Sequence, residues 1–258
     1  MTSRTSRTSR AAIRARRAAA LVAVGAVGLV VACTLAPFDI GPQDDSYPPA
    51  PDQQLPEPAD GTAGSRLATP VARLADPTWV RETAARTGVP ERALGAYAGA
   101  ALRTAETHPG CGIGWNTLAG VGEVETDHGR HDGSSVDAAG RVTPPILGVA
   151  LDGDGVMAVP DTDDGALDGD ERWDRAVGPM QFIPATWQAH AQDGDLDGTT
   201  DVHQYDDAAL TAAVYLCRSG GDLTSDDGWT AALARYNRSA AYARDVAEHA
   251  EDYGEPAA

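Results

Sequence analysis

The chain contains no lysine, so all 20 of its basic residues are arginines. Six of these arginines precede the first acidic residue, Asp39, and removing their charge from the total of −18 leaves −24 for the rest of the chain. Binding to nucleic acid and adhesion to anionic membranes both depend on cationic side chains. The charge balance therefore argues against both of these functions and predicts no nucleic-acid partner.

Aromatic residues are also scarce, at 5% of the chain, with two phenylalanines against five tryptophans. Hydrophobic residues nevertheless make up 42% of the sequence, which argues against a wholly disordered protein. A chain of 258 residues is long enough for one domain of roughly 150–200 residues with additional segments.

No apolar run reaches the length of about 20 residues that a membrane span requires. The longest run, 15 residues over 18–32, follows an arginine-rich stretch without acids, and this order predicts an export signal over residues 1–33. Its end, Val30-Val31-Ala32-Cys33, resembles a bacterial lipobox, in which the cysteine carries a lipid. We expect an exported protein of the cell envelope, held by a lipid on Cys33 or by a signal anchor, or secreted.

Only three cysteines are present, Cys33, Cys111 and Cys217. If Cys33 belongs to the signal or carries a lipid, an even pair remains, and in an exported protein such a pair predicts a disulfide between Cys111 and Cys217. Closing so long a loop stabilises a fold by about 4–5 kcal/mol in the chain-entropy description. The alternative is two buried free thiols.

The segment 34–75 is rich in Pro, Asp, Gln and Gly and lacks an apolar period, which predicts a flexible linker. Helical periodicity begins at the Asp76-Pro77 start signal. Residues 129–177 show no period, and no segment alternates as a strand does. We therefore predict a mainly α domain over residues 76–258 with a long irregular Asp/Gly-rich insertion, and helices over about 76–86, 89–107, 115–127, 184–192, 206–218, 228–237 and 239–252.

The helix predicted over 115–127 places a carboxylate among apolar residues. At 100° per residue, Glu125 shares a stripe with Leu118 and Val121, whereas Glu123 falls among small and polar residues and is expected to be solvated. Burial disfavours a charged carboxylate and raises its pKa, which makes such a group a proton donor near neutral pH. The alternative is a structural ion pair between Glu125 and an arginine such as Arg130.

Three motifs follow one another along the chain: residues 122–130 (GEVETDHGR), residues 178–187 (GPMQFIPATW) and the pair Tyr236-Asn237. In this order they resemble the motifs of lytic murein transglycosylases of the membrane-bound type B group, in particular actinobacterial forms. The resemblance covers about residues 76–252, and it implies a lysozyme-like fold.

The family resemblance implies cleavage of the bond between N-acetylmuramic acid and N-acetylglucosamine in peptidoglycan glycan strands, with formation of 1,6-anhydro ends. It makes Glu125 the single catalytic acid and base. Gln181 would contact substrate or position Glu125, and Phe182 would shape the cleft wall. Tyr236 would hydrogen-bond the catalytic carboxyl, while Asn237 would hold nearby backbone or an acetamido group. The enzyme is expected to act as a monomer and to require no cofactor.

An acidic loop follows the start of a calcium-binding EF-hand. Asp193, Asp195 and Asp197 take the first ligand positions, Thr199 the backbone-carbonyl position, and Asp201 the ninth. Position 12 is Gln204 instead of the bidentate glutamate, so a solvated acidic turn is the alternative to a structural Ca²⁺ site. The acidic run 161–174 lacks ligand spacing and is interpreted as a charged surface loop.

Two other functions compete with the lytic transglycosylase. One is a lysozyme-type muramidase of the same fold, in which an aspartate activates water. The other is a non-catalytic lipoprotein that binds the cell wall. A zinc site at His128-x-x-His131 is disfavoured because the spacing is short and no cysteine or further histidine lies nearby in the sequence.

Overall fold

The computed structural model describes residues 46–61, 64 and 66–255. Contacts divide the chain into residues 1–43 and a compact unit over residues 44–258, and all described residues belong to the second unit. The predicted export signal and Cys33 lie outside the described residues. Within the described part of the chain, no helix has both the length and the apolarity needed to span a bilayer.

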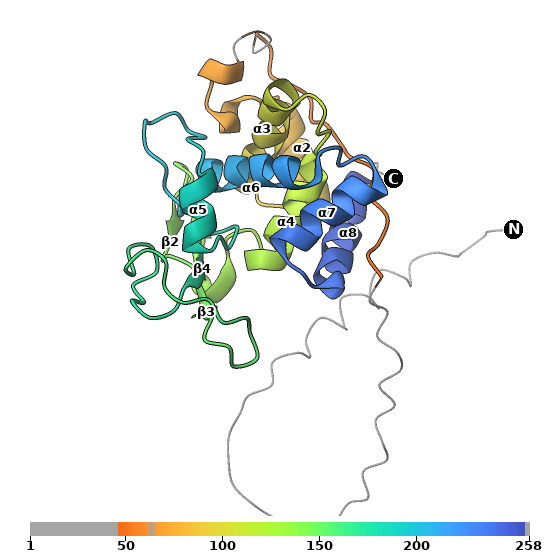
Figure 1. Ribbon diagram of the computed structural model, residues 1–258. Helices are drawn as coiled ribbons and strands as arrows, with labels where there is room; N and C mark the ends of the chain where they lie inside the picture. Colours follow the sequence, from red (N-terminus) through yellow and green to blue (C-terminus); the bar gives the residue numbers. More distant parts are fainter. Residues whose placement is uncertain (1–45, 62–63, 65, 256–258) are drawn as a thin grey trace, which may run out of the picture. The chain divides into compact units, whose positions relative to one another are not determined.

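The described unit contains seven α-helices, as the periodicity predicted (Figure 1). Asp76 begins the first of them by accepting hydrogen bonds from the backbone N–H groups of Thr78 and Trp79, and Gly88 ends it with φ of 81°. The helices are α2 (Pro77–Thr87), α3 (Glu91–Thr107), α4 (Trp115–Thr126), α5 (Pro184–His190), α6 (Tyr205–Gly220), α7 (Asp226–Tyr236) and α8 (Ala240–Gly254).

Four short strands lie in the segment for which no strand was predicted. β1 (Ser135–Val136) pairs antiparallel with β2 (Val142–Thr143), and β3 (Leu147–Ala150) pairs antiparallel with β4 (Arg175–Val177). Each strand has two to four residues, which is too short for an alternating pattern to be recognised. Figure 1 shows these strands and the long loops around them on the side of α5, away from α7 and α8.

The helix that carries Glu125 is surrounded by other helices. α4 packs against α3 and α8, and the apolar side chains between them, including Leu118 and Val121, are fully buried. Gly120 allows α8 to come close, because a Cβ at this position would lie 2.6 Å from the carbonyl oxygen of Val246. This close approach brings a side chain of α8 to Glu125, as described below.

The prediction of a flexible linker is wrong for the described part of 46–75, because this segment packs on the helical domain. The Gln53 Oε1 atom accepts hydrogen bonds from the backbone N–H of Gly114 and the hydroxyl of Thr117. The backbone N–H of Gln54 donates to Asn116 Oδ1, and Trp115 N–H donates to the Gln54 carbonyl. Gln53 thus provides the cap that Gly114, at the start of α4, cannot provide from its own side chain.

The later part of the same segment is partly buried. It forms two 3₁₀ turns, η1 (Arg66–Ala68) and η2 (Val71–Arg73), and Val71 and Leu74 have no exposed surface. Gly99 of α3 makes room for η2, since a Cβ there would clash with the Val71 carbonyl. The segment is held by contacts with residues far away in the sequence, which local composition does not reveal.

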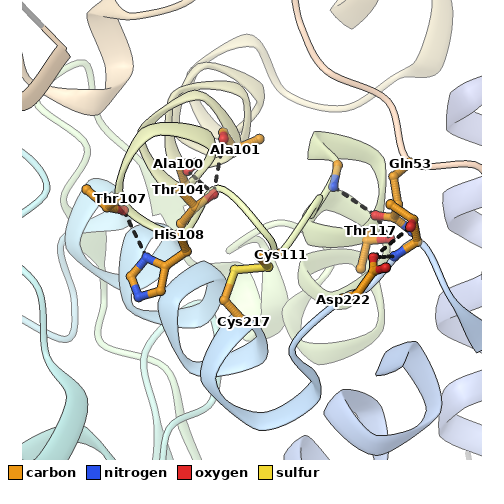
Figure 2. Close-up of a disulfide and its surroundings, with 12 residues drawn as sticks. Gln53, Ala100, Ala101, Thr104, Thr107, His108, Cys111, Thr117, Cys217 and Asp222 are labelled. Atoms are coloured by element: carbon orange, nitrogen blue, oxygen red, sulfur yellow. Dashed lines mark hydrogen bonds between the residues drawn. A yellow bond between two sulfur atoms is a disulfide. The ribbon is translucent and has the colours of Figure 1, made fainter. Parts of the chain in front are cut away.

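The predicted disulfide between Cys111 and Cys217 is present, with 5.3 Å between the Cα atoms. Figure 2 shows that it joins the turn after α3 to α6. Both cysteines are almost fully buried. The bond therefore closes a loop of 106 residues that contains α4 and the whole irregular segment.

Candidate active site

A groove of about 960 Å³ opens beside the C-terminal half of α4. Its walls come from α4, α7, the loop before α5 and the irregular segment near residue 155. All five residues that the family resemblance assigned to substrate chemistry line it. They are Glu125, Gln181, Phe182, Tyr236 and Asn237.

Among the described residues that line the groove, Glu125 is the only acidic one. Its side chain is partly exposed to the groove, and burial of the carboxyl raises its pKa from 4.5 to about 7, against a lowering effect of one hydrogen bond from Tyr242. The alternative ion pair with Arg130 does not form, because the Arg130 guanidinium pairs with Asp127. Glu125 therefore retains a proton up to near neutral pH.

Glu123, two residues earlier, has the opposite environment. Its carboxylate lies 3.0 Å from His128 Nε2 and accepts a hydrogen bond of 3.0 Å from the Tyr253 hydroxyl. The hydrogen bond with His128 is the main reason that the pKa of Glu123 falls to about 2. Glu123 is thus part of a structural network rather than the solvated residue that was expected, and the buried His128 belongs to that network rather than to a zinc site.

The hydrogen bond predicted between Tyr236 and Glu125 is wrong. The Tyr236 hydroxyl donates to the Met180 carbonyl at 2.7 Å, whereas Tyr242 of α8 donates to Glu125 Oε1 at 2.6 Å. Tyr242 and Tyr236 stack with 6.5 Å between their ring centroids. Sequence reasoning missed Tyr242 because it lies on the apolar face of α8, where a tyrosine is expected to be ordinary core packing.

Replacing Tyr242 by phenylalanine is expected to move the alkaline limb of the pH–activity profile to higher pH. The hydroxyl stabilises the ionised form of Glu125 and so lowers its pKa. Without the Tyr242 hydroxyl, Glu125 loses its proton at a higher pH, so the protonated form that donates to the substrate is present over a wider pH range. The measurement is the pH dependence of kcat on purified peptidoglycan. Tyr236→Phe is the matched control, and an unmoved limb in Tyr242→Phe or a moved limb in the control would contradict this assignment.

Gln181 and Phe182 reach the groove from a tight turn. The backbone groups of Val177 and Phe182 exchange hydrogen bonds of 2.9 and 3.0 Å, which closes the turn around Gly178. Gln181 adopts φ of +46°, a backbone region that non-glycine residues rarely occupy, and its amide donates to the Gly178 carbonyl at 2.9 Å. Phe182 packs against Trp187, which is a core residue with 5% exposure.

Asn237 lies at the groove edge in the turn between α7 and α8. Its Oδ1 atom accepts a hydrogen bond of 3.0 Å from the backbone N–H of Ser239, and Ser239 is the N-cap residue of α8. Of the two roles left open for Asn237, the structure shows the contact with nearby backbone.

The acidic loop brings together three of its five predicted ligands. Carboxylate oxygens of Asp193, Asp195 and Asp197 lie within 4.8 Å of one another, and Asp193 Oδ1 is buried without a hydrogen-bond partner in the described structure. Asp201 instead pairs with Arg141 at 2.6 Å, and the Thr199 hydroxyl donates to Asp197. Asp201 thus forms an ion pair in this structure, and its role as a ligand stays a prediction.

Gln204, at position 12 of the loop, and Asp207 both hold the loop through hydrogen bonds. Gln204 donates from Nε2 to Asp195 Oδ2 at 2.7 Å. Asp207 accepts backbone hydrogen bonds from Gly194 and Asp201, and its burial raises its pKa to about 7. Asp207, which has no place in the loop motif, therefore holds both ends of the loop.

The interpretation of 161–174 as a simple surface loop needs correction. Asp161, Asp163 and Asp174 also bring carboxylate oxygens within 4.8 Å of one another, and Asp174 is fully buried. Asp174 accepts hydrogen bonds from the backbone and hydroxyl of Thr162. The sequence did not reveal this cluster because Asp174 reaches it through the fold of the loop, not through regular spacing.

The match to a known protein family includes Gln181 and Phe182 of the groove, whereas Glu125, Tyr236 and Asn237 lie outside it. Residues 171–232 match the family model described as "Transglycosylase SLT domain". This match includes the turn at Gly178, α5, α6 and part of α7, and together with the helical architecture it supports the predicted mainly α, lysozyme-like fold class.

Two solved structures resemble the chain weakly. The Escherichia coli lytic transglycosylase Slt35 in complex with bulgecin A has a TM-score of 0.40 and 16% identity, over 68% of this chain and 77% of that chain. The same enzyme in complex with calcium has a TM-score of 0.40 and 15% identity, over 68% and 78%. No curated protein matches the chain.

Proposed function

We propose that the protein is a peptidoglycan lytic transglycosylase of the type B group, which cleaves the β-1,4 bond between N-acetylmuramic acid and N-acetylglucosamine with Glu125 as its single acid and base. One observation carries the proposal: a carboxyl whose pKa is about 7 lines a groove together with Gln181 and Tyr236. The transglycosylase family match over residues 171–232 supports it.

In the proposed reaction, Glu125 first donates its proton to the glycosidic oxygen as the bond between that oxygen and C1 of the muramic residue breaks. The resulting carboxylate then accepts the proton of the C6 hydroxyl of the same residue, and the C6 oxygen bonds to C1. The product is a 1,6-anhydro ring, no water is consumed, and Glu125 ends the cycle protonated. The Tyr242 hydroxyl stabilises the carboxylate between the two steps.

The groove offers no second carboxylate for a hydrolase of the two-acid type. Such enzymes place a pair of carboxyl groups about 5–9.5 Å apart across the scissile bond. Among the described residues that line the groove, Glu125 alone is acidic. This composition favours a reaction in which one group serves as both acid and base.

Digestion of purified peptidoglycan followed by mass analysis of the fragments separates the two reactions. The proposed lytic reaction predicts fragments one water lighter than those from a muramidase, because the C6 hydroxyl replaces water as the nucleophile. A muramidase treated in parallel provides the reference masses. Fragments that carry only reducing ends would overturn the transglycosylase mechanism and favour the hydrolase.

We further propose that Asp193, Asp195 and Asp197 bind a structural Ca²⁺. Three clustered carboxylates, one with a buried oxygen that lacks a partner, suit a cation that takes oxygen ligands. The ion would stabilise the turn that leads into α6 and takes no part in the chemistry. The catalytic reaction itself requires no cofactor in this proposal.

A chelator is expected to lower the Tm of the wild-type protein, because a ligand that binds only the folded state stabilises it by mass action. The Asp195→Ala variant should have a lower Tm from the start and show no response to chelator. Asp252→Ala, which changes an exposed aspartate of α8, should respond as the wild type does. Equal Tm values of the wild type with and without chelator would contradict the calcium site.

The location follows from the substrate, since the cell wall lies outside the cytoplasmic membrane. We propose that the protein acts in the cell envelope as a monomer, since one chain supplies the whole groove lining. A lipid on Cys33 would tether it near its substrate. Release from membranes by detergent but not by salt is the result expected of a lipid tether, and release by salt alone would contradict it.

A further inference from the structure

The groove carries positive charge in a protein that is strongly acidic. The chain has 38 acidic residues against 20 arginines, yet the lining of the groove contains two arginines, Arg235 and Arg238, and one acidic residue, Glu125. At neutral pH a large share of Glu125 is protonated, so the arginines dominate the charge of the groove. Such a local reversal of sign is what recognition of an anionic group requires.

A helix dipole explains only part of this arrangement. Arg235 lies in the last turn of α7, where a cation stabilises the helix end. Arg238 lies beyond the helix, in the turn that leads to α8. Within the described structure, neither guanidinium forms an ion pair or a hydrogen bond, whereas the exposed Arg130 and Arg141 each bind an aspartate.

The backbone at both arginines is fixed. The Tyr215 hydroxyl donates to the Arg235 carbonyl at 3.2 Å, and the Tyr47 hydroxyl donates to the Arg238 carbonyl at 3.0 Å. The charge of Arg235 also acts on its surroundings, because burial and then the positive charges of Arg218 and Arg235 lower the pKa of His190. The two side chains thus extend from an anchored edge, and their charge is not neutralised there.

We propose that Arg235 and Arg238 form a subsite for carboxylates, and that it binds the peptide stems of the glycan strand during cleavage. The inference rests on the proposed lytic function. The sugars of the strand are neutral, whereas the stems carry free carboxylates, and the planar fork of a guanidinium binds a carboxylate through two parallel hydrogen bonds. The subsite makes strands with charged stems better substrates than strands with neutral stems.

The test compares two preparations of one purified peptidoglycan. One is native, and in the other the stem carboxylates have been converted to amides with carbodiimide and ammonia, which keeps the stem length. Binding is measured by sedimentation at low salt, and cleavage by release of soluble fragments. The proteins are the wild type, the double variant Arg235→Gln/Arg238→Gln, and Arg73→Gln, which changes an exposed arginine of η2 outside the groove.

The wild type and Arg73→Gln should bind and cleave native wall about tenfold better than amidated wall, and the double variant should bring this ratio close to one. Equal binding of both walls by the wild type, or an unchanged ratio in the double variant, would overturn the carboxylate subsite. Failure of the wild type to cleave either wall would instead contradict the lytic function, and sedimentation would still measure the preference for carboxylates.

Discussion

Replacement of Glu125 by glutamine is expected to lower the rate of peptidoglycan cleavage by about 10²–10⁴-fold, the usual contribution of a positioned acid or base. The amide keeps the size of the side chain but neither donates a proton to the glycosidic oxygen nor accepts one from the C6 hydroxyl. Binding of glycan strands should persist, because the groove lining is otherwise unchanged. The measurements are the initial rate of fragment release and the sedimentation of protein with the wall.

The same substitution should leave the protein folded and change the pH dependence of its stability. The pKa of Glu125 is raised in the folded state, so its protonated form favours folding, and the free energy of unfolding falls as pH rises from about 4.5 to about 7. Glu125→Gln removes this decrease. Glu248→Gln, an exposed glutamate of α8, is the matched control and should retain full activity. An unchanged cleavage rate in Glu125→Gln would mean that other residues carry out the chemistry, whereas a wild type that binds the wall but does not cleave it would support the non-catalytic wall-binding protein.

Removal of the disulfide by the double change Cys111→Ala/Cys217→Ala is expected to lower the free energy of unfolding by about 4–5 kcal/mol. The bond restricts the unfolded chain over a loop of 106 residues, and longer loops gain more from closure. Because the loop contains α4, loss of the disulfide removes a restraint on the part of the chain that carries Glu125. Chemical denaturation monitored by circular dichroism measures the difference.

A reducing agent provides an internal control for the disulfide. The wild type should become as unstable in reductant as the double variant, and the variant itself should not respond. Equal stability of wild type and double variant would show that the bond is not formed in solution, and the two buried thiols of the alternative interpretation would then apply.

The sequence predicted the parts of the site that depend on local periodicity. The position of Glu125 on the apolar stripe with Leu118 and Val121 depends on one helix alone. The structure confirms that its carboxyl is largely buried, as the helical periodicity predicted. The helix boundaries follow from equally local signals, such as the cap at Asp76.

Features that depend on contacts between distant elements were not predictable in this way. The choice of Tyr242 over Tyr236 as the partner of Glu125 depends on how closely α8 approaches α4 at Gly120, and no local pattern encodes that distance. The packing of 46–61 likewise depends on Gln53, whose side chain caps a helix 61 residues further along the chain. The composition of this segment predicted a linker, because composition and periodicity contain no information on hydrogen bonds to residues far away in the sequence.

The most direct test of the account is a titration of the Glu125 carboxyl itself. The difference in carboxyl infrared absorption between the wild type and Glu125→Gln, followed from pH 4 to pH 9, isolates this one group. We predict that the protonated band disappears with a midpoint near pH 7, because burial beside the groove holds the proton. A midpoint near the ordinary value of 4.5 would mean that no proton donor is present at neutral pH, and the proposed mechanism would be wrong.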